Sequence, residues 1–371
     1  MAEVLGPMTV IQRALPTGVD GVKMAQWRMK SGITFQEFVN RTGNAIGGLN
    51  QEMMDQWDFL FSLTDMDVFE YEDGGSVTEL PDITDESDPD IFHGTTIGHM
   101  IELRVYGTAL GGTRRYFRDS REAQILSTLR GFLRRARWRF EKRLLSRLFL
   151  STETQIGSVG YNVPFVHGTG GNVDFAPPAF EGEAFTTSHD HFVFNNTGYA
   201  ELLEAMVETL HEHGHQPPFD AIVSDADVDA YRVLAGFIKP VSADIIVIDR
   251  AAATTGNEFF SRGQPMYGPG GVFGGFESGR GRINLRSNKR VPTDYAALFK
   301  SYGRNDDRNP LKVRVHPDEG FGAWIEAVGS DRDDYPIRKL NAEMEFGVGV
   351  GDRTNGVVGR QNSAWTDPTI T

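Results

Sequence analysis

The chain has 371 residues, which is long enough for two or three domains with a sizeable buried core. Its 39% apolar content and 25 phenylalanines are typical of a folded protein, and its 51 acidic and 37 basic residues give a net charge of −14. This acidic balance argues against a general nucleic-acid-binding protein. The absence of cysteine excludes disulfides, thiolate metal sites and cysteine nucleophiles.

The first part of the chain reads as an arm followed by a helix. Residues 1–33 contain scattered glycine and proline without periodicity, which predicts an extended arm, and they lack the pattern of a signal peptide. No apolar run in the chain is long enough to span a bilayer. Residues 34–63 are predicted to form a helix that is broken near Gly43 and Gly47. We expect a soluble protein of the cytoplasm, without membrane association.

An acidic segment follows. Between residues 65 and 90 there are eleven acidic residues and no lysine or arginine, and β-type runs flank the segment on both sides. We therefore expect 65–118 to form a long two-stranded excursion with an acidic tip. Because an isolated two-stranded ribbon is only marginally stable in water, this ribbon is expected to lie on a neighbouring subunit. The acids of the tip lack the spacing of a calcium-binding loop.

The central prediction is a long helix over 119–150. Apolar residues recur at three-and-four spacing from Ile125 to Leu148, and Asp119 with Glu122 forms a helix-start signal. No proline interrupts the segment. At about 1.5 Å per residue, a helix of this length is a rod of roughly 45 Å, well beyond the average globular helix, so we call it the spine helix.

The spine helix is basic although the chain is acidic. Its nine basic and three acidic residues give it a net charge of +6, so the rest of the chain sums to −20. One interpretation is a solvated charged face that pairs with acidic loops of its own or a neighbouring chain. The other is a face turned toward a polyanion such as packaged nucleic acid, with Arg130, Arg134 and Arg137 as candidate DNA-facing residues. The sequence leaves both open.

The second half of the chain alternates between helices and strands. Residues 151–195 are loop-like, and 196–214 form an amphipathic helix that ends at Gly214. The expected strands are 219–224, 242–249 (buried), 311–315, 321–328 and a last long strand with a turn over 340–358. The expected short helices are 225–236 and 292–303, and 251–291 is expected to be rich in loops.

Two motifs suggest chemistry without establishing it. His211 and His215 fit the H-E-x-x-H pattern of zinc peptidases. The helix should stop at Gly214, however, which leaves His215 beyond its end with no evident third ligand. A zinc-dependent hydrolase using His211 and His215 is therefore only an alternative. The glycine-rich stretch 268–282 lacks a phosphate-loop ending and a following helix, so a flexible surface loop is favoured. We find no catalytic constellation and predict no enzyme activity and no cofactor.

The order of these parts resembles the major capsid proteins of tailed bacteriophages, whose Hong Kong 97-like fold is shared with encapsulins. The resemblance is carried by the arm, the acidic excursion, the spine helix, and the stretches LLEAMVETLHEHGHQPPFDAIVS (202–224) and EMEFGVGVGDRTNGVV (343–358). It implies an α+β fold in five segments. These are an arm and helix (1–64), an extended β-loop (65–118), a peripheral domain (119–215, with the spine helix), an axial domain (216–330) and a last peripheral strand with the C-terminus (331–371).

The resemblance also implies a function. The chain would be a structural protein that self-assembles, through pentamers and hexamers, into an icosahedral head shell around double-stranded DNA. The location would be the virion capsid, assembled in the bacterial cytoplasm. Further partners would be a portal, a scaffolding protein encoded separately, because little chain precedes the excursion, and a decoration protein. An encapsulin-type nanocompartment is the alternative within the same fold.

Some members of this family cross-link their shells through a lysine on the extended loop. Here no lysine lies between Lys30 and Lys142, so we expect electrostatic reinforcement between subunits instead. The candidate inter-subunit residues are Asp82, Asp85, Glu86, Asp88, Asp90, Arg114 and Arg115.

Overall fold

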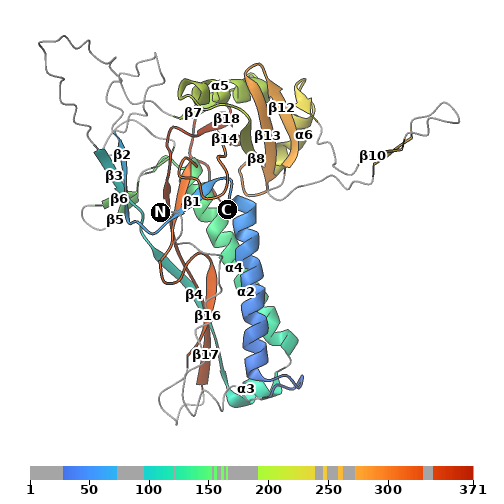
Figure 1. The fold of residues 1–371 in the computed structure, drawn as a ribbon, viewed down its shortest axis with the longest axis vertical. Helices are drawn as coiled ribbons and strands as arrows, with labels where there is room; N and C mark the ends of the chain where they lie inside the picture. Colours follow the sequence, from blue (N-terminus) through green and yellow to red (C-terminus); the bar gives the residue numbers. More distant parts are fainter. Residues whose placement is uncertain are drawn as a thin grey trace, which may run out of the picture.

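The computed structural model describes residues 28–72, 96–120, 122–152, 154–156, 160–162, 164–165, 191–238, 245–248, 258–261, 272–328 and 337–370. Two long helices, α2 (Phe35–Trp57) and α4 (Glu122–Phe149), run side by side, and a long β-ribbon lies along them (Figure 1). A seven-stranded sheet with its own helices sits at one end of this body (Figure 1). In the described ranges, no helix is both long and apolar enough to cross a membrane.

Helix α2 begins with a complete capping box. The amide of Glu37 donates to Oγ1 of Thr34 at 3.2 Å, and the amide of Thr34 donates to the Glu37 carboxylate at 2.8 Å. The Glu37 carboxylate accepts hydrogen bonds from both the amide and the hydroxyl of Thr34, and these lower the pKa of Glu37 because they favour its ionised form. The helix runs without interruption through Gly43 and Gly47, so the predicted break is wrong. Packing of its apolar face outweighs the low helix propensity of glycine.

The other end of α2 also differs from the prediction. The helix stops at Trp57, and Phe61–Thr64 forms strand β1 instead of continuing the helix to residue 63. Asn50 ties the helix to the sheet beside it, because its side-chain amide donates to the carbonyl of Ala323 at 2.9 Å and accepts from the amide of Ala323 at 2.8 Å.

The spine helix is confirmed as α4, but it begins at Glu122, and Asp119, the predicted start, instead ends a separate short helix. Its apolar stripe is buried as the spacing predicts, and its last two turns are surrounded by other elements, so that apolar side chains on several faces are covered. The buried side chains are Leu129, Phe132, Ala136, Phe140, Leu144, Leu145, Leu148 and Phe149.

The excursion is only partly as predicted. Strands β2 (Val68–Glu72) and β3 (Thr96–Met100) pair antiparallel and join no other sheet among the described residues. The return half is different: β4 (Arg104–Thr113) pairs along its whole length with β17 (Ile337–Val350), and a short helix, α3 (Arg114–Asp119), precedes the spine. The predicted acidic tip lies outside the described residues.

The β-ribbon beside the helices belongs to a five-stranded sheet. Its order is β1, β15 (Leu311–Arg314), β17, β16 (Ala323–Val328), and β4 also pairs with β17. The sheet packs on the spine helix through an aromatic cluster in which the Phe140 ring lies 5.3 Å from the rings of both Phe321 and Phe346. Phe61 of β1 joins this cluster, 5.8 Å from Phe140.

The seven-stranded sheet collects strands from widely separated parts of the chain. Its order is β7 (Phe192–Asn195), β18 (Val357–Gln361), β14 (Tyr295–Phe299), β8 (Phe219–Ser224), β13 (Gly281–Asn288), β12 (Val272–Ser278) and β9 (Phe237–Ile238). Helix α5 (Tyr199–Glu212) covers one face, and the turn η2 (Asp225–Asp227) and helix α6 (Val228–Arg232) follow β8. The opposite face packs against the core around α2 and α4.

Two predictions fail in this sheet. Residues 292–303 were expected to be helical, but they contain β14, whose residues alternate between the two cores: Ala296 and Leu298 face α5, while Tyr295, Ala297 and Phe299 face the spine side. Because both faces are buried, the strand is apolar throughout and shows no period of two.

The glycine-rich stretch is not a surface loop. From residue 272 onward it forms β12 and the start of β13, an antiparallel hairpin, so the expectation of loops is wrong for 272–288, whereas 251–257 and 262–271 lie outside the described residues. A Cβ atom at Gly274 would collide with the Phe237 ring of the neighbouring strand β9, which explains why glycine occupies this position.

The expected domain limits separate strands that share a sheet. β7 and β18 lie outside 216–330 but pair into the seven-stranded sheet, and β15 and β16 lie inside 216–330 but belong to the five-stranded sheet. The remaining strands are β5 (Thr154–Ile156) with β6 (Gly160–Asn162), and β10 (Ile245–Ile248) with β11 (Glu258–Ser261). The five segments stay a prediction.

Candidate assembly and polyanion-binding surfaces

The basic residues of the spine helix divide into three environments. The first is an ionic node between the helices and the seven-stranded sheet. Arg137 reaches α2, with Nη1 3.3 Å from the Glu52 carboxylate and Nη2 hydrogen-bonded to Gln56, and its Nε donates to Glu141 at 3.3 Å. Glu141 is buried and accepts from Nε of Arg290 at 2.6 Å. We call Glu52, Arg137, Glu141 and Arg290 the junction node.

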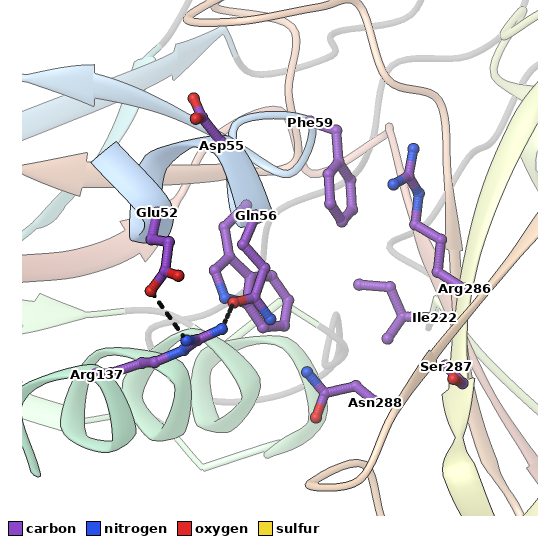
Figure 2. Close-up of a pocket in the computed structure, with 10 residues that line it drawn as sticks. Glu52, Asp55, Gln56, Phe59, Arg137, Ile222, Arg286, Ser287 and Asn288 are labelled. Carbon is purple, nitrogen blue, oxygen red and sulfur yellow. Dashed lines mark hydrogen bonds and ion pairs between the residues drawn. The ribbon is translucent and has the colours of Figure 1, made fainter. Parts of the chain in front are cut away.

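Next to the junction node lies a hollow of about 410 Å³ (Figure 2). Its walls come from the end of α2, the spine helix, β8 and β13, and Figure 2 shows Glu52 and Arg137 on one side and Arg286 on the other. Arg286 lies 3.0 Å from the Asp220 carboxylate, and its guanidinium stacks 4.0 Å from the Phe59 ring. Arg137 and Arg286, which line the hollow, therefore already have acidic partners within the chain, and this fits a structural contact between the helices and the sheet better than a binding site.

The second environment is an exposed row along the spine helix. Arg130 and Arg134 are exposed and form no hydrogen bond or ion pair with any described residue. They continue at intervals of four into Trp138 and Lys142, whose ammonium group lies 5.3 Å from the Trp138 ring. We call these four residues the basic ridge; at about 1.5 Å per residue it is roughly 18 Å long. Arg137, the third candidate DNA-facing residue, is instead bound in the junction node.

The third environment is the side of the spine helix that faces β4. Arg135, Arg139, Arg143 and Arg147 also recur every fourth residue. The first three directly follow members of the basic ridge in the sequence, so this row lies about 100° around the helix from the ridge. Tyr106 of β4 lies among them, with the guanidinium of Arg139 5.1 Å from its ring and Nε of Arg143 donating to its hydroxyl at 3.0 Å. We call this the groove row.

Most of the predicted inter-subunit residues lie in a part of the chain that the structure does not describe. Asp82, Asp85, Glu86, Asp88 and Asp90 lie outside the described residues. Arg114 and Arg115 open α3, at the end of the helical body far from the seven-stranded sheet (Figure 1), but the positions of their side chains are not described. Their role between subunits stays a prediction.

The two candidate zinc ligands have separate partners. Nε2 of His211 lies 3.2 Å from the carbonyl of Arg280, whereas His215, beyond the helix end as predicted, is bound on both ring nitrogens by Tyr302 (2.8 Å) and Thr354 (3.1 Å). Burial lowers the pKa of His215. Among the described residues, no group of three or more His, Cys, Asp or Glu side chains could hold a metal.

Another buried histidine lies at the base of the β2–β3 hairpin. Burial, together with the nearby charges of Arg147 and Arg353, lowers the pKa of His99 to about 3. Its ring packs against β17, since a Cβ atom at Gly349 would approach His99 Nε2 to 3.0 Å. This histidine is therefore neutral in the folded protein at physiological pH.

Sequence reasoning missed several members of these sites. The spacing of Arg137 and Glu141 marks an ion pair on one helix and is visible in the sequence. No local signal identifies Arg290, which reaches Glu141 from 149 residues further along the chain, or Tyr106, which becomes a partner only when β4 packs beside the spine helix.

Comparison with known proteins shows the fold. No family model matches the chain, and no curated protein matches it. A solved structure from Mycobacterium phage Patience is similar over 94% of both chains, with a TM-score of 0.61 at 20% identity.

Two weaker likenesses carry no argument of their own. The capsid structure of the cyanophage P-SCSP1u has a TM-score of 0.46 at 8% identity, over 82% of this chain and 87% of that one. The SrpI encapsulin complex of Synechococcus elongatus has a TM-score of 0.37 at 11% identity, over 84% of this chain and 89% of that one.

The architecture follows from the likeness to the Mycobacterium phage Patience structure together with four features of the chain: the long spine helix, the β-ribbon along it, the separate β2–β3 hairpin and the seven-stranded sheet. The chain has an α+β fold of the Hong Kong 97-like type.

Proposed function

We propose that the chain is the major capsid protein of a tailed bacteriophage, a structural subunit of the icosahedral head shell around double-stranded DNA. The observation that carries the proposal is the likeness in fold to the structure from Mycobacterium phage Patience, which extends over 94% of both chains. In this proposal the protein has no catalytic role and needs no cofactor.

The form of the chain suits assembly. The β2–β3 hairpin joins no other sheet of the described chain, although a two-stranded ribbon is marginal alone, so contact with another copy would stabilise it. Each subunit would make many modest contacts with several neighbours, and these add up because a closed shell engages them simultaneously. Pentamers and hexamers of one chain would build the shell.

The basic ridge is proposed to face the packaged DNA. Arg130 and Arg134 have no acidic partner among the described residues, and Lys142 and Trp138 extend the row. Contacts of this kind bind phosphates without regard to sequence and weaken as salt rises. A portal, a separate scaffolding protein and a decoration protein are further proposed partners, and assembly would take place in the bacterial cytoplasm.

The test is electron microscopy of the protein expressed with its neighbouring genes. The expected result is closed icosahedral shells or rings of capsomers, and DNA recovered from particles of an infected host. A small shell filled with protein cargo would instead indicate a nanocompartment. A monomer or dimer under all salt conditions, with stoichiometric zinc in the purified protein, would favour the hydrolase alternative and contradict the proposal.

A further inference from the structure

The groove row and strand β4 line two adjoining, strongly basic hollows, which we together call the groove, and β5, β6 and β17 complete the wall of one of them. Two adjoining hollows of about 390 Å³ each lie between the spine helix and β4, and Tyr106 lines both. Arg135 and Arg139 line one hollow, and Arg143, Arg147 and Arg104 line the other. The acidic residue lining them is Glu102, which pairs with Arg104 at 2.6 Å, whereas Arg147 donates to the carbonyl of Asn162 at 3.1 Å. Arg135, Arg139 and Arg143 therefore add three positive charges to the groove.

The guanidinium groups of Arg139 and Arg143 are held in place but not neutralised. Arg139 and Arg143 flank the Tyr106 ring, at 5.1 and 5.9 Å from its centre. No carboxylate lies within ion-pair distance of Arg135, Arg139 or Arg143 in the part of the chain that the structure describes. Each guanidinium carries five donors, so most of those donors remain available for a carboxylate.

The walls of the groove fit a peptide better than a nucleic acid. Phe132 and Met344 form its floor, and Val105 at its rim is 61% exposed. A channel between a helix and a strand admits a single extended chain, whereas duplex DNA needs a broad surface such as the basic ridge. Mixed arginine and apolar walls suit a chain that carries both carboxylates and apolar side chains.

The sequence of this protein contains such a chain. Residues 79–92, ELPDITDESDPDIF, hold six acids, no base, and the apolar residues Leu80, Ile83, Ile91 and Phe92. An extended peptide from residue 82 to residue 88 reaches roughly 20 Å, and the groove row from Arg135 to Arg147 is roughly 18 Å long. Charge, length and apolar content therefore match.

We infer that the groove between the spine helix and β4 binds the acidic segment 79–92 of a second copy of this chain. The inference rests on the proposed shell function, since it needs copies held side by side. The electrostatic reinforcement between subunits then has a defined binding site. Carboxylates of one copy bind the guanidinium groups of the groove row in the other copy, where Tyr106 positions those of Arg139 and Arg143.

Cysteine cross-linking tests this directly, because the chain has no cysteine of its own. Ser146→Cys lies in the groove, and Ser87→Cys lies within the acidic segment without removing an acid. After assembly and mild oxidation with diamide, which takes up the two thiol hydrogens, the double variant is expected to give a ladder of covalent oligomers on a denaturing gel. The control pairs Ser87→Cys with Ser127→Cys, an exposed position of the spine helix that lines neither hollow and lies roughly 28 Å along the helix from Ser146, and it should stay monomeric.

A charge test complements the cross-link. Adding Arg139→Gln and Arg143→Gln to the double-cysteine variant should lower the cross-linking yield roughly tenfold, whereas Arg130→Gln with Arg134→Gln removes the same charge from the basic ridge and should leave the yield unchanged. Raising the salt concentration should weaken the first effect, because exposed charges are screened.

Each outcome decides between readings. An internal cross-link within one chain would overturn the assignment to a second copy, and intact shells without any cross-link would overturn the inference while leaving the proposed function standing. If the groove variant instead lost affinity for double-stranded DNA in a filter-binding assay and the ridge variant did not, the groove would be a nucleic-acid surface and the inference wrong. Unmutated protein that forms no shells would contradict the proposed function itself.

Discussion

Replacement of Glu141 by glutamine is expected to destabilise the protein by removing the centre of the junction node. The Glu141 side chain is 6% exposed and is held by Arg290 at 2.6 Å and Arg137 at 3.3 Å. The loss of the short charged hydrogen bond to the mostly buried Arg290 should cost about 2 kcal/mol. The longer contact with Arg137, which is 38% exposed, adds little after allowance for solvent screening.

The total loss is therefore about 2–3 kcal/mol of unfolding free energy. For a chain of 371 residues, it should lower the midpoint of thermal unfolding by roughly 3–4 °C. The matched control is Glu52→Gln, which removes the partner of Arg137 on α2. Glu52 is 67% exposed and 3.3 Å from Arg137, so its loss should cost less than about 0.5 kcal/mol. Both changes remove one negative charge and keep the shape of the side chain.

Calorimetry or circular dichroism of the purified variants measures both effects. A double-mutant cycle with Arg290→Gln should return a coupling free energy of about 1–2 kcal/mol between residues 141 and 290. Equal shifts for Glu141→Gln and Glu52→Gln, or a coupling free energy near zero, would refute the reasoning, because burial would then not distinguish the two carboxylates.

Three further predictions concern other parts of the molecule. Gly274→Val should destabilise the protein by about 2 kcal/mol or more, since its side chain would meet the Phe237 ring, and a normal melting temperature would contradict this. His99 has a folded pKa of about 3, below its unfolded value, so its contribution to stability is complete above pH 6.5 and is lost as pH falls toward 3, by up to about 1.4 kcal/mol per unit; His99→Gln should flatten this slope in acid titrations followed by fluorescence. Replacing Asp85, Glu86 and Asp88 together by alanine should lower the temperature of shell disassembly, and unchanged disassembly in light scattering would count against electrostatic reinforcement.

The sequence predicts helices better than it predicts the sheets that join them. The spine helix is visible because Phe132, Ala136 and Phe140 recur on one face. β14 escapes detection because Tyr295 and Ala296 are buried in different cores, so no polar residue marks a solvent face. A helical interpretation of this apolar run is the natural error when periodicity is the only guide.

The candidate surfaces show the same limit. The sequence places Arg130, Arg134 and Arg137 near one stripe of the helix, and that geometry alone predicts one shared role. The structure separates Arg137 from the other two, because α2 and its Glu52 cover that part of the stripe. Partners that come from distant segments, such as Arg290 and Tyr106, depend on tertiary packing, which no local pattern encodes.

Strand β17 has a mechanical consequence. Along its length it pairs with β4, β16 and β15, and after the turn that contains the buried Asn355 the same chain enters the seven-stranded sheet as β18. A pull applied at either end of the molecule would therefore travel along a covalent backbone instead of across a side-chain interface. Sliding β17 out of place would require its ladders on both edges to break together, since the load acts along the strand and divides among their hydrogen bonds. A shell built from such subunits would yield first at the contacts between chains.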